Sequence, residues 1–320
     1  MALVGIARLA SHSELLEAKA RVTYYEIPAR SILNRTKPYM PFQWTINPYR
    51  GCEFGCQYCY ARYTHEFMEM GVRDFEDHIY AKAAAAHLLR QELARIDRRH
   101  HIAIGTATDP YQPAERRFER TRSILEVFAR ERGLHLSITT KSDLVPRDLP
   151  LLREIARSNM LDIHFTITTL DEKLARLIEP RAPRPTLRLA AVEKLSAAGL
   201  SVGVFPSPVM PLLTDSEAQL DRVAKGARDS GAQYFGGHAL FLMPCAQKVF
   251  LPFLDQHFPE LAPRYRQWYE SSAHLGRAYK EMLRARLQKL RDRYGLSSRP
   301  AERRPELWQD PEQPTLFPLQ

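Results

Sequence analysis

Short apolar runs alternate with longer amphipathic stretches along most of this chain. The apolar runs, rich in Val, Ile, Leu and other strand formers, lie at residues 42–46, 102–107, 134–140, 161–168, 200–206 and 234–240. Helical patterns separate them at residues 74–98, 119–131, 149–158, 186–198 and 215–230. Strands that alternate with helices of this length are typical of βαβ units, in which the strands are parallel.

Six parallel strands predict an α/β fold, a partial (β/α)6 TIM-type barrel rather than a closed eight-stranded one. Such barrels place their chemistry at the carboxyl ends of the strands. The pattern predicts four parts, an N-terminal extension (1–41), the barrel (42–252), a C-terminal helical region (253–296) and a proline-rich flexible tail (297–320). Within the two ends, residues 13–20 and 275–294 have helical patterns.

Composition narrows the class of protein only a little. The chain has 320 residues, 44% of them hydrophobic, which is ordinary for a globular protein, and no apolar run approaches the length of a membrane span. A net charge of +9 suits an acidic partner such as nucleic acid, but solvated arginine-rich helix faces explain it equally well. Four cysteines and no secretory signal favour a reducing, cytoplasmic location.

Three of the four cysteines lie within eight residues. Cys52, Cys56 and Cys59 have the spacing C-x3-C-x2-C, which lets three thiolates converge on one metal centre and leaves a further coordination position open. Glycines at 51 and 55 allow the backbone to wrap closely around a bulky group. The alternative is a zinc site whose fourth ligand is His65 or the distant Cys245.

Polar residues follow the predicted strands where a barrel would place its site. Thr108 follows the second strand, Lys141 the third, and Thr166 and Thr168 end the fourth, where alternate residues face the same side. Lys141 suits the carboxylate of a bound amino acid, because a charge at a barrel mouth is costly without a partner. Each threonine is explained equally well as a strand former or a helix cap.

The cysteine motif, with Tyr58 before its third cysteine, resembles the signature of radical S-adenosylmethionine (SAM) enzymes. Further motifs resemble the spore photoproduct lyase-like branch of that superfamily, from about residue 29 to about residue 252. They are Asn-Pro-Tyr-Arg-Gly-Cys at 47–52, Cys-x-Tyr-Cys-Tyr-Ala-Arg at 56–62, Thr-Asp-Pro-Tyr-Gln-Pro at 108–113, Thr-Thr-Lys-Ser at 139–142, Glu-Pro-Arg at 179–181 and the leucine-rich segment around Arg188.

The resemblance implies a cofactor set and its ligands. Cys52, Cys56 and Cys59 would hold three irons of a [4Fe–4S] cluster, and SAM would chelate the fourth. Tyr58 would lie against the SAM adenine. Thr108, Lys141 and Thr166 would contact SAM as well, with Lys141 on its carboxylate.

The resemblance also implies a reaction class. An electron from an external donor of the flavodoxin or ferredoxin type would cleave SAM reductively, and the resulting 5′-deoxyadenosyl radical would abstract hydrogen from a substrate. Spore photoproduct lyases carry a hydrogen-donating cysteine where this chain has Thr106, so we do not expect repair of the spore photoproduct. Cys245 lies much later and suits a core position.

The tail contains a second, weaker motif. Gln313, Leu316 and Phe317 form the pattern Q-x-x-L-F, which resembles peptides that bind bacterial DNA sliding clamps, although Pro314 replaces the more usual leucine. A clamp partner would favour DNA as the substrate.

Three hypotheses follow from the sequence. The chain is a radical SAM enzyme acting on nucleic acid, in DNA repair or modification, or a radical SAM enzyme acting on a protein or small molecule, or a zinc-stabilised nucleic-acid-binding protein without catalysis.

Overall fold

The computed structural model describes residues 3–302 and 304–308, and its centre is a seven-stranded sheet. The strand order is β11-β10-β9-β8-β7-β4-β3, with parallel pairing from β11 to β4 and an antiparallel edge strand β3. Its strands are β3 Leu33–Arg35, β4 Trp44–Ile46, β7 His101–Ile104, β8 His135–Thr140, β9 Met160–Thr166, β10 Ser201–Phe205 and β11 Tyr234–Phe235. All six strands expected from the sequence are present, so the predicted partial barrel is confirmed.

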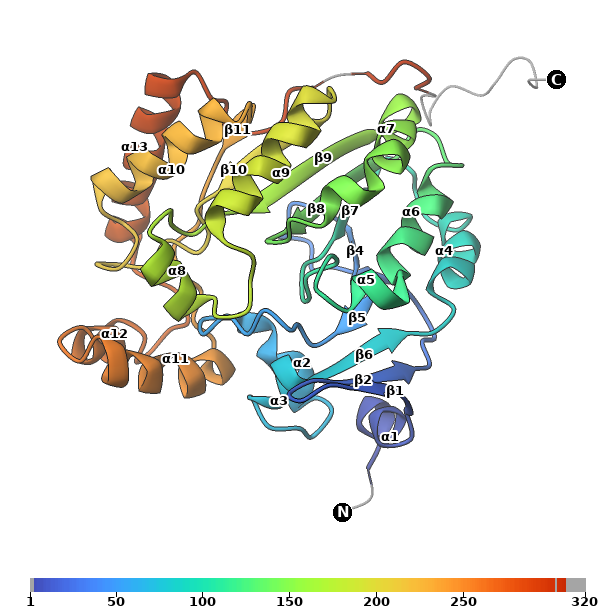
Figure 1. Cartoon of the computed structure of the whole chain (residues 1–320), viewed down its shortest axis with the longest axis horizontal. Helices are drawn as coiled ribbons and strands as arrows, with labels where there is room; N and C mark the ends of the chain where they lie inside the picture. Colours follow the sequence, from blue (N-terminus) through green and yellow to red (C-terminus); the bar gives the residue numbers. More distant parts are fainter. Residues whose placement is uncertain (1–2, 303, 309–320) are drawn as a thin grey trace.

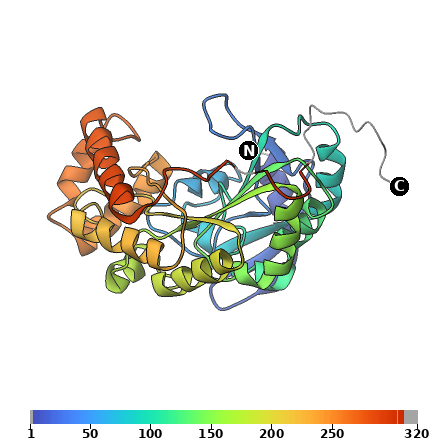
Figure 2. The same ribbon diagram turned by 90° about the horizontal axis from the view of Figure 1, so that it is seen from above.

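Helices cover the outer face of this sheet, as Figures 1 and 2 show. The helices along the barrel are α4 Ala85–Leu93, α5 Glu115–Phe118, α6 Arg120–Phe128, α7 Leu149–Ser158, α8 Glu172–Ile178, α9 Pro185–Ala197 and α10 Glu217–Asp229, with a 3₁₀ turn at Val145–Asp148. Two of them begin at residues whose side chains accept backbone N–H groups, Asp171 before α8 and Ser216 before α10.

The main core lies between the sheet and these helices. Along β9, Leu161, Ile163 and Phe165 belong to that core, whereas Asp162 and His164 alternate with them and face the barrel interior. Leucines of the C-terminal helix α13 Arg277–Tyr294 join the same core. The predicted helix at 275–294 is therefore present, and it packs on the barrel.

A second, four-stranded sheet lies beside the barrel, with the order β1-β2-β6-β5. Its strands are β1 Glu14–Ala18, β2 Thr23–Ile27, β6 His78–Lys82 and β5 Tyr49–Arg50, and α1 Gly5–Ser11 packs near them. The expectation of a helix at 13–20 is wrong, because residues 14–18 pair with β2. The expectation of one helix at 74–98 is also wrong, because a strand separates α3 Asp74–Asp77 from α4.

The remaining helices gather around the loop that carries the cysteines. They are the 3₁₀ turn Tyr60–Arg62, α2 Tyr63–Glu66, α11 Pro244–His257 and α12 Ala262–Trp268. The side chains of α11 and α12 share an apolar cluster with Cys52, Cys56 and Tyr58. Among the described residues, none of the helices combines the length and the hydropathy of a membrane-spanning segment. The tail motif at 313–317 lies outside the described residues.

Candidate active site

The cysteine loop begins where β5 ends, beside the carboxyl ends of the barrel strands. Gly51 has φ of +80°, and a Cβ at this position would lie 2.6 Å from the carbonyl oxygen of His78, so only glycine fits without a shift. The Cys52 N–H donates to the Phe75 carbonyl at 2.9 Å, and the Cys59 N–H donates to the Cys56 carbonyl at 3.2 Å. The loop is therefore fixed to its neighbours by its own backbone.

Side chains after β7 hold the start of the loop. The Thr108 hydroxyl donates to the Gly51 carbonyl at 2.6 Å, and Gln112 Nε2 donates to the same carbonyl at 3.0 Å. Gln112 also accepts the Glu53 N–H at 2.9 Å. In this structure the side chain of Thr108, a sequence candidate for SAM binding, thus supports the loop, and its contact with SAM stays a prediction.

The carboxylate of Glu53 ties the loop to β2 and to the start of α5. It accepts the Tyr24 hydroxyl of β2 at 2.8 Å and the backbone N–H of Ala114 at 2.7 Å. Arg62 supports the other end, where its fully buried guanidinium is paired with Glu76 and donates to the Cys56 carbonyl at 3.1 Å. The loop is held by side chains from four separate segments.

The three cysteine thiols are free and lie close enough to act on one another electrostatically. Burial raises the pKa of each thiol, that of Cys56 to about 12. Lys141 opposes this effect most strongly at Cys56, and Arg62 does so at Cys59. Three free thiols, two of them buried and that of Cys59 partly buried, fit an iron–sulfur cluster, because the nearby cations favour the thiolate forms that bind iron.

The nearer candidate for a fourth zinc ligand, His65, has another partner in this structure. Its Nε2 contacts the His78 carbonyl at 3.0 Å, and its ring packs against Phe75. The zinc alternative therefore gains no support from this histidine.

Cys245 lies on α11, next to the loop but turned to its backbone. Its Sγ donates to the Tyr60 carbonyl at 3.4 Å, and the residue is only 2% exposed. This agrees with the core position expected from the sequence.

Lys141 is positioned by a residue that sequence reasoning left without a role. Asp109 accepts the Lys141 N–H at 2.7 Å and the Thr140 hydroxyl at 2.7 Å, which joins the ends of β7 and β8. The Lys141 ammonium lies 5.7 Å from the centre of the Tyr58 ring. Burial acts to lower the pKa of Lys141, but Cys56 and Glu179 together outweigh it and raise that pKa.

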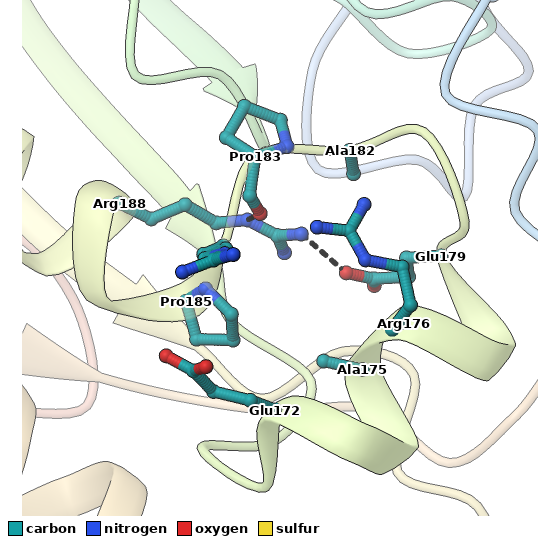
Figure 3. A pocket seen from close by; sticks show the side chains of 9 residues that line it. Glu172, Ala175, Arg176, Glu179, Ala182, Pro183, Pro185 and Arg188 are labelled. Atoms are coloured by element: carbon teal, nitrogen blue, oxygen red, sulfur yellow. Dashed lines mark hydrogen bonds and ion pairs between the residues drawn. The ribbon is translucent and has the colours of Figure 1, made fainter.

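A buried ion pair stands behind Tyr58. Arg188 contacts Glu179 at 2.6 Å, and both side chains are 1% exposed. Glu179 also accepts the hydroxyls of Tyr58 and Thr168. Figure 3 shows the pair among the side chains that line a small pocket, together with Arg176 and Pro183. Burial acts against the charge of Glu179, but Arg188 and then Lys141 hold its pKa below the usual value.

Thr166 and Thr168 lie on the barrel side of this pair. The Thr166 carbonyl accepts from Arg188 at 3.1 Å, and the Thr168 hydroxyl lies 3.2 Å from the Tyr58 hydroxyl. Thr106 lies on the opposite side, where its hydroxyl contacts Thr45 and accepts from Asn47. The structure therefore brings Tyr58, Lys141 and the cysteines together, and it adds Glu179 and Arg188, which sequence motifs marked without a function.

Comparison with known proteins gives the family. The radical SAM superfamily model matches residues 46–223. The uncharacterized protein Rv2578c of Mycobacterium tuberculosis is 38% identical over 302 residues, which are 92% of this chain and 88% of that protein. The uncharacterized protein MJ0683 of Methanocaldococcus jannaschii is 29% identical over 246 residues, 75% of this chain and 86% of that protein.

Among solved structures, spore photoproduct lyase complexed with a dinucleoside spore photoproduct superposes with a TM-score of 0.65. The match covers 92% of this chain and 84% of that chain at 15% identity, so it shows a shared fold. The family model spans more than half of the chain and includes the whole cysteine loop, and this protein therefore belongs to the radical SAM superfamily.

Proposed function

We propose that Cys52, Cys56 and Cys59 hold a [4Fe–4S] cluster with SAM at its open position, and that the enzyme acts on nucleic acid. Membership of the family implies the cluster and SAM. The observation that supports these ligands is that three free thiols of one loop lie near enough to act on one another electrostatically, beside Lys141 at the carboxyl end of the sheet. When bound, the cluster supplies the electron that cleaves SAM to a 5′-deoxyadenosyl radical.

The residues around the loop have distinct proposed roles. Lys141 binds the SAM carboxylate, and the Tyr58 ring, held by Glu179 and Thr168, packs against the adenine. Thr166, the last residue of β9, makes a further contact with SAM. Burial of this region among apolar side chains excludes water from the radical.

Two observations support a nucleic-acid substrate. The chain carries a net charge of +9, and it shares the fold of a lyase whose solved complex contains a dinucleoside photoproduct. Thr106 argues against the lyase reaction itself, because a hydroxyl is a poor hydrogen-atom donor compared with a thiol. We therefore propose DNA repair or modification of a different kind.

The basic helix α13 does not add to the support for nucleic-acid binding, because several of its cations make contacts within the protein. Lys289 pairs with Glu217 at 3.1 Å, Arg293 pairs with Asp221, and Arg286 donates to the Asp215 carbonyl at 2.6 Å. These cations hold α13 against α10 and the residues just before it. This supports a structural role for the basic residues of α13.

The cofactor proposal is tested by anaerobic purification, followed by chemical reduction of the protein in the presence of SAM. We expect a brown protein with about four irons per chain that produces 5′-deoxyadenosine. A colourless protein with one zinc would contradict it. Deuterium exchange between 5′-deoxyadenosine and candidate substrates tests the substrate class, since label in a protein or small molecule instead of an oligonucleotide would favour the alternative.

The electron donor and the clamp are proposals about partners. A flavodoxin or ferredoxin should support turnover in place of a chemical reductant. Deleting residues 313–317 should abolish binding to a sliding clamp, and unchanged binding would remove that partner.

A further inference from the structure

Two cations lie side by side on the four-stranded sheet, next to the cysteine loop. Arg50 of β5 pairs with Tyr80 of β6 in antiparallel register, and Lys82 is two residues farther along β6. Side chains two residues apart on a strand share a face, so Arg50 and Lys82 are diagonal neighbours, with Cα atoms about 7–8 Å apart. The two charged side chains therefore lie on the same face of this sheet.

Both cations are at least partly buried, and neither has an ion-pair partner among the described residues. Lys82 is only 7% exposed and Arg50 is partly buried. Within the described part of the chain, neither charged group makes a hydrogen bond or an ion pair. The acidic group that acts on Lys82 is Glu92, beyond ion-pair distance, and its carboxylate accepts the backbone N–H groups of Ile32 and Leu33 at 2.8–3.3 Å.

Two other buried cations near the site, unlike Arg50 and Lys82, have carboxylate partners. Arg62 is paired with Glu76, and Arg188 is paired with Glu179. An unpaired buried charge is costly, and two adjacent like charges are more so. Burial lowers the pKa of Lys82 to about 7, and the charge of Arg50 lowers it further than Glu92 can restore. The pair therefore has no negative group at ion-pair distance within residues 3–302 and 304–308.

We propose that a phosphate-type oxyanion binds between Arg50 and Lys82. A guanidinium fork and a compact ammonium are the two side chains that bind phosphate oxygens best. Arg50 directly precedes Gly51 and Cys52, so an anion there would brace the strand that leads into the cluster loop. Assignment of the anion to a phosphate of a nucleic-acid substrate rests on the proposed function, whereas the site itself does not.

Thermal unfolding of the cluster-loaded enzyme in inorganic phosphate, against chloride at equal ionic strength, tests the site. We expect phosphate to raise the midpoint of the wild type by about 2–4 °C. Lys82→Met and Arg50→Met should lose this shift, and Lys194→Met, at an exposed lysine of α9, should keep it. Without phosphate, Lys82→Met should be as stable as the wild type or more so, because it removes an unpaired buried charge.

Two results would overturn the site. One is an equal phosphate shift in the wild type and in Lys82→Met. The other is a lower midpoint for Lys82→Met in chloride, which would mean that Glu92 already satisfies the lysine. Should Lys82→Met fail to fold, Arg50→Met gives the same comparison.

The source of the phosphate is tested by competition. A short single-stranded oligonucleotide should displace labelled inorganic phosphate from the wild type, and the same oligonucleotide with uncharged methylphosphonate linkages should not. If neither displaces it, the site holds free phosphate and the link to a nucleic-acid substrate fails. Failure of the proposed function alone would leave the phosphate shift intact.

Discussion

Replacing Arg188 by methionine should destabilise this protein far more than the loss of an ordinary ion pair. The substitution leaves the Glu179 carboxylate buried without the guanidinium that contacts it at 2.6 Å. It also leaves the carbonyls of Pro183 and Thr166 without their donors, which lie at 2.9 and 3.1 Å. We expect a loss of about 3–5 kcal/mol, because an uncompensated buried charge dominates and the hydroxyls of Tyr58 and Thr168 remain on Glu179.

A matched control is available in the neighbouring pair of Arg181 and Asp77. Their atoms lie 2.8 Å apart, but the side chains are 32% and 40% exposed, so Arg181→Met should cost at most about 1 kcal/mol. Urea unfolding of both variants at pH 7, followed by circular dichroism, measures the difference. Equal free energies of unfolding for the two variants would refute the role given to burial.

The pH dependence gives a second check on the same variant. In the wild type, the pKa of Glu179 is held below its ordinary value, so its contribution to stability is present at neutral pH and is lost as the pH falls through that depressed pKa. In Arg188→Met the main cause of that lowering is gone, and burial should raise the pKa. The difference in free energy of unfolding between the wild type and Arg188→Met should therefore become smaller as the pH falls from 7 to 5. The double variant Glu179→Gln/Arg188→Met should recover part of the lost stability at pH 7.

Other predictions concern the cofactor and the core. Cys56→Ala should lose both its iron and its production of 5′-deoxyadenosine. Cys245→Ala should keep both, because the Cys245 thiol donates only to a backbone carbonyl. Loss of iron in Cys245→Ala would instead identify Cys245 as an iron ligand. Lys141→Met should raise the KM for SAM about 10–100-fold without changing the iron content, whereas Lys194→Met should leave the KM unchanged. Equal KM values for the two variants would refute the contact between Lys141 and the SAM carboxylate. The pKa of His65 is lowered by burial to about 4, so its neutral form stabilises the fold above about pH 6.5 and this is lost as the pH falls towards 4. His65→Phe should remove up to about 3 kcal/mol of that pH dependence with iron retained, and urea unfolding at several pH values would show an unchanged slope if the reasoning is wrong.

The barrel was predictable because its strands are buried and short. Residues 134–140 and 161–168, for example, are apolar runs whose length and β-branched content already favour strands, and β8 and β9 occupy them. The second sheet was not predictable in this way. Residues 14–18 read Glu-Leu-Leu-Glu-Ala, all good helix formers, and only the pairing with β2 makes them a strand.

The site was predictable to the extent that its chemistry is local. Three cysteines in one loop and a lysine after a strand carry their own signal. The pairing of Glu179 with Arg188, and of Asp109 with the backbone of Lys141, depends on which strand ends meet in space. The available signal was Arg188, a charged residue inside the otherwise apolar run 187–192, which needs a buried partner.

The position of Glu53 has a consequence for where this enzyme can be cut or recombined. The carboxylate that stands between the first two cysteines is held by Tyr24, which lies upstream of the family-model match at 46–223. A chimera that exchanged only the matched segment would import the three cysteines without the strand that anchors their loop. The segment needed to build the proposed site therefore starts at β2 of the four-stranded sheet, and a gene fragment that encodes the barrel alone would be too short.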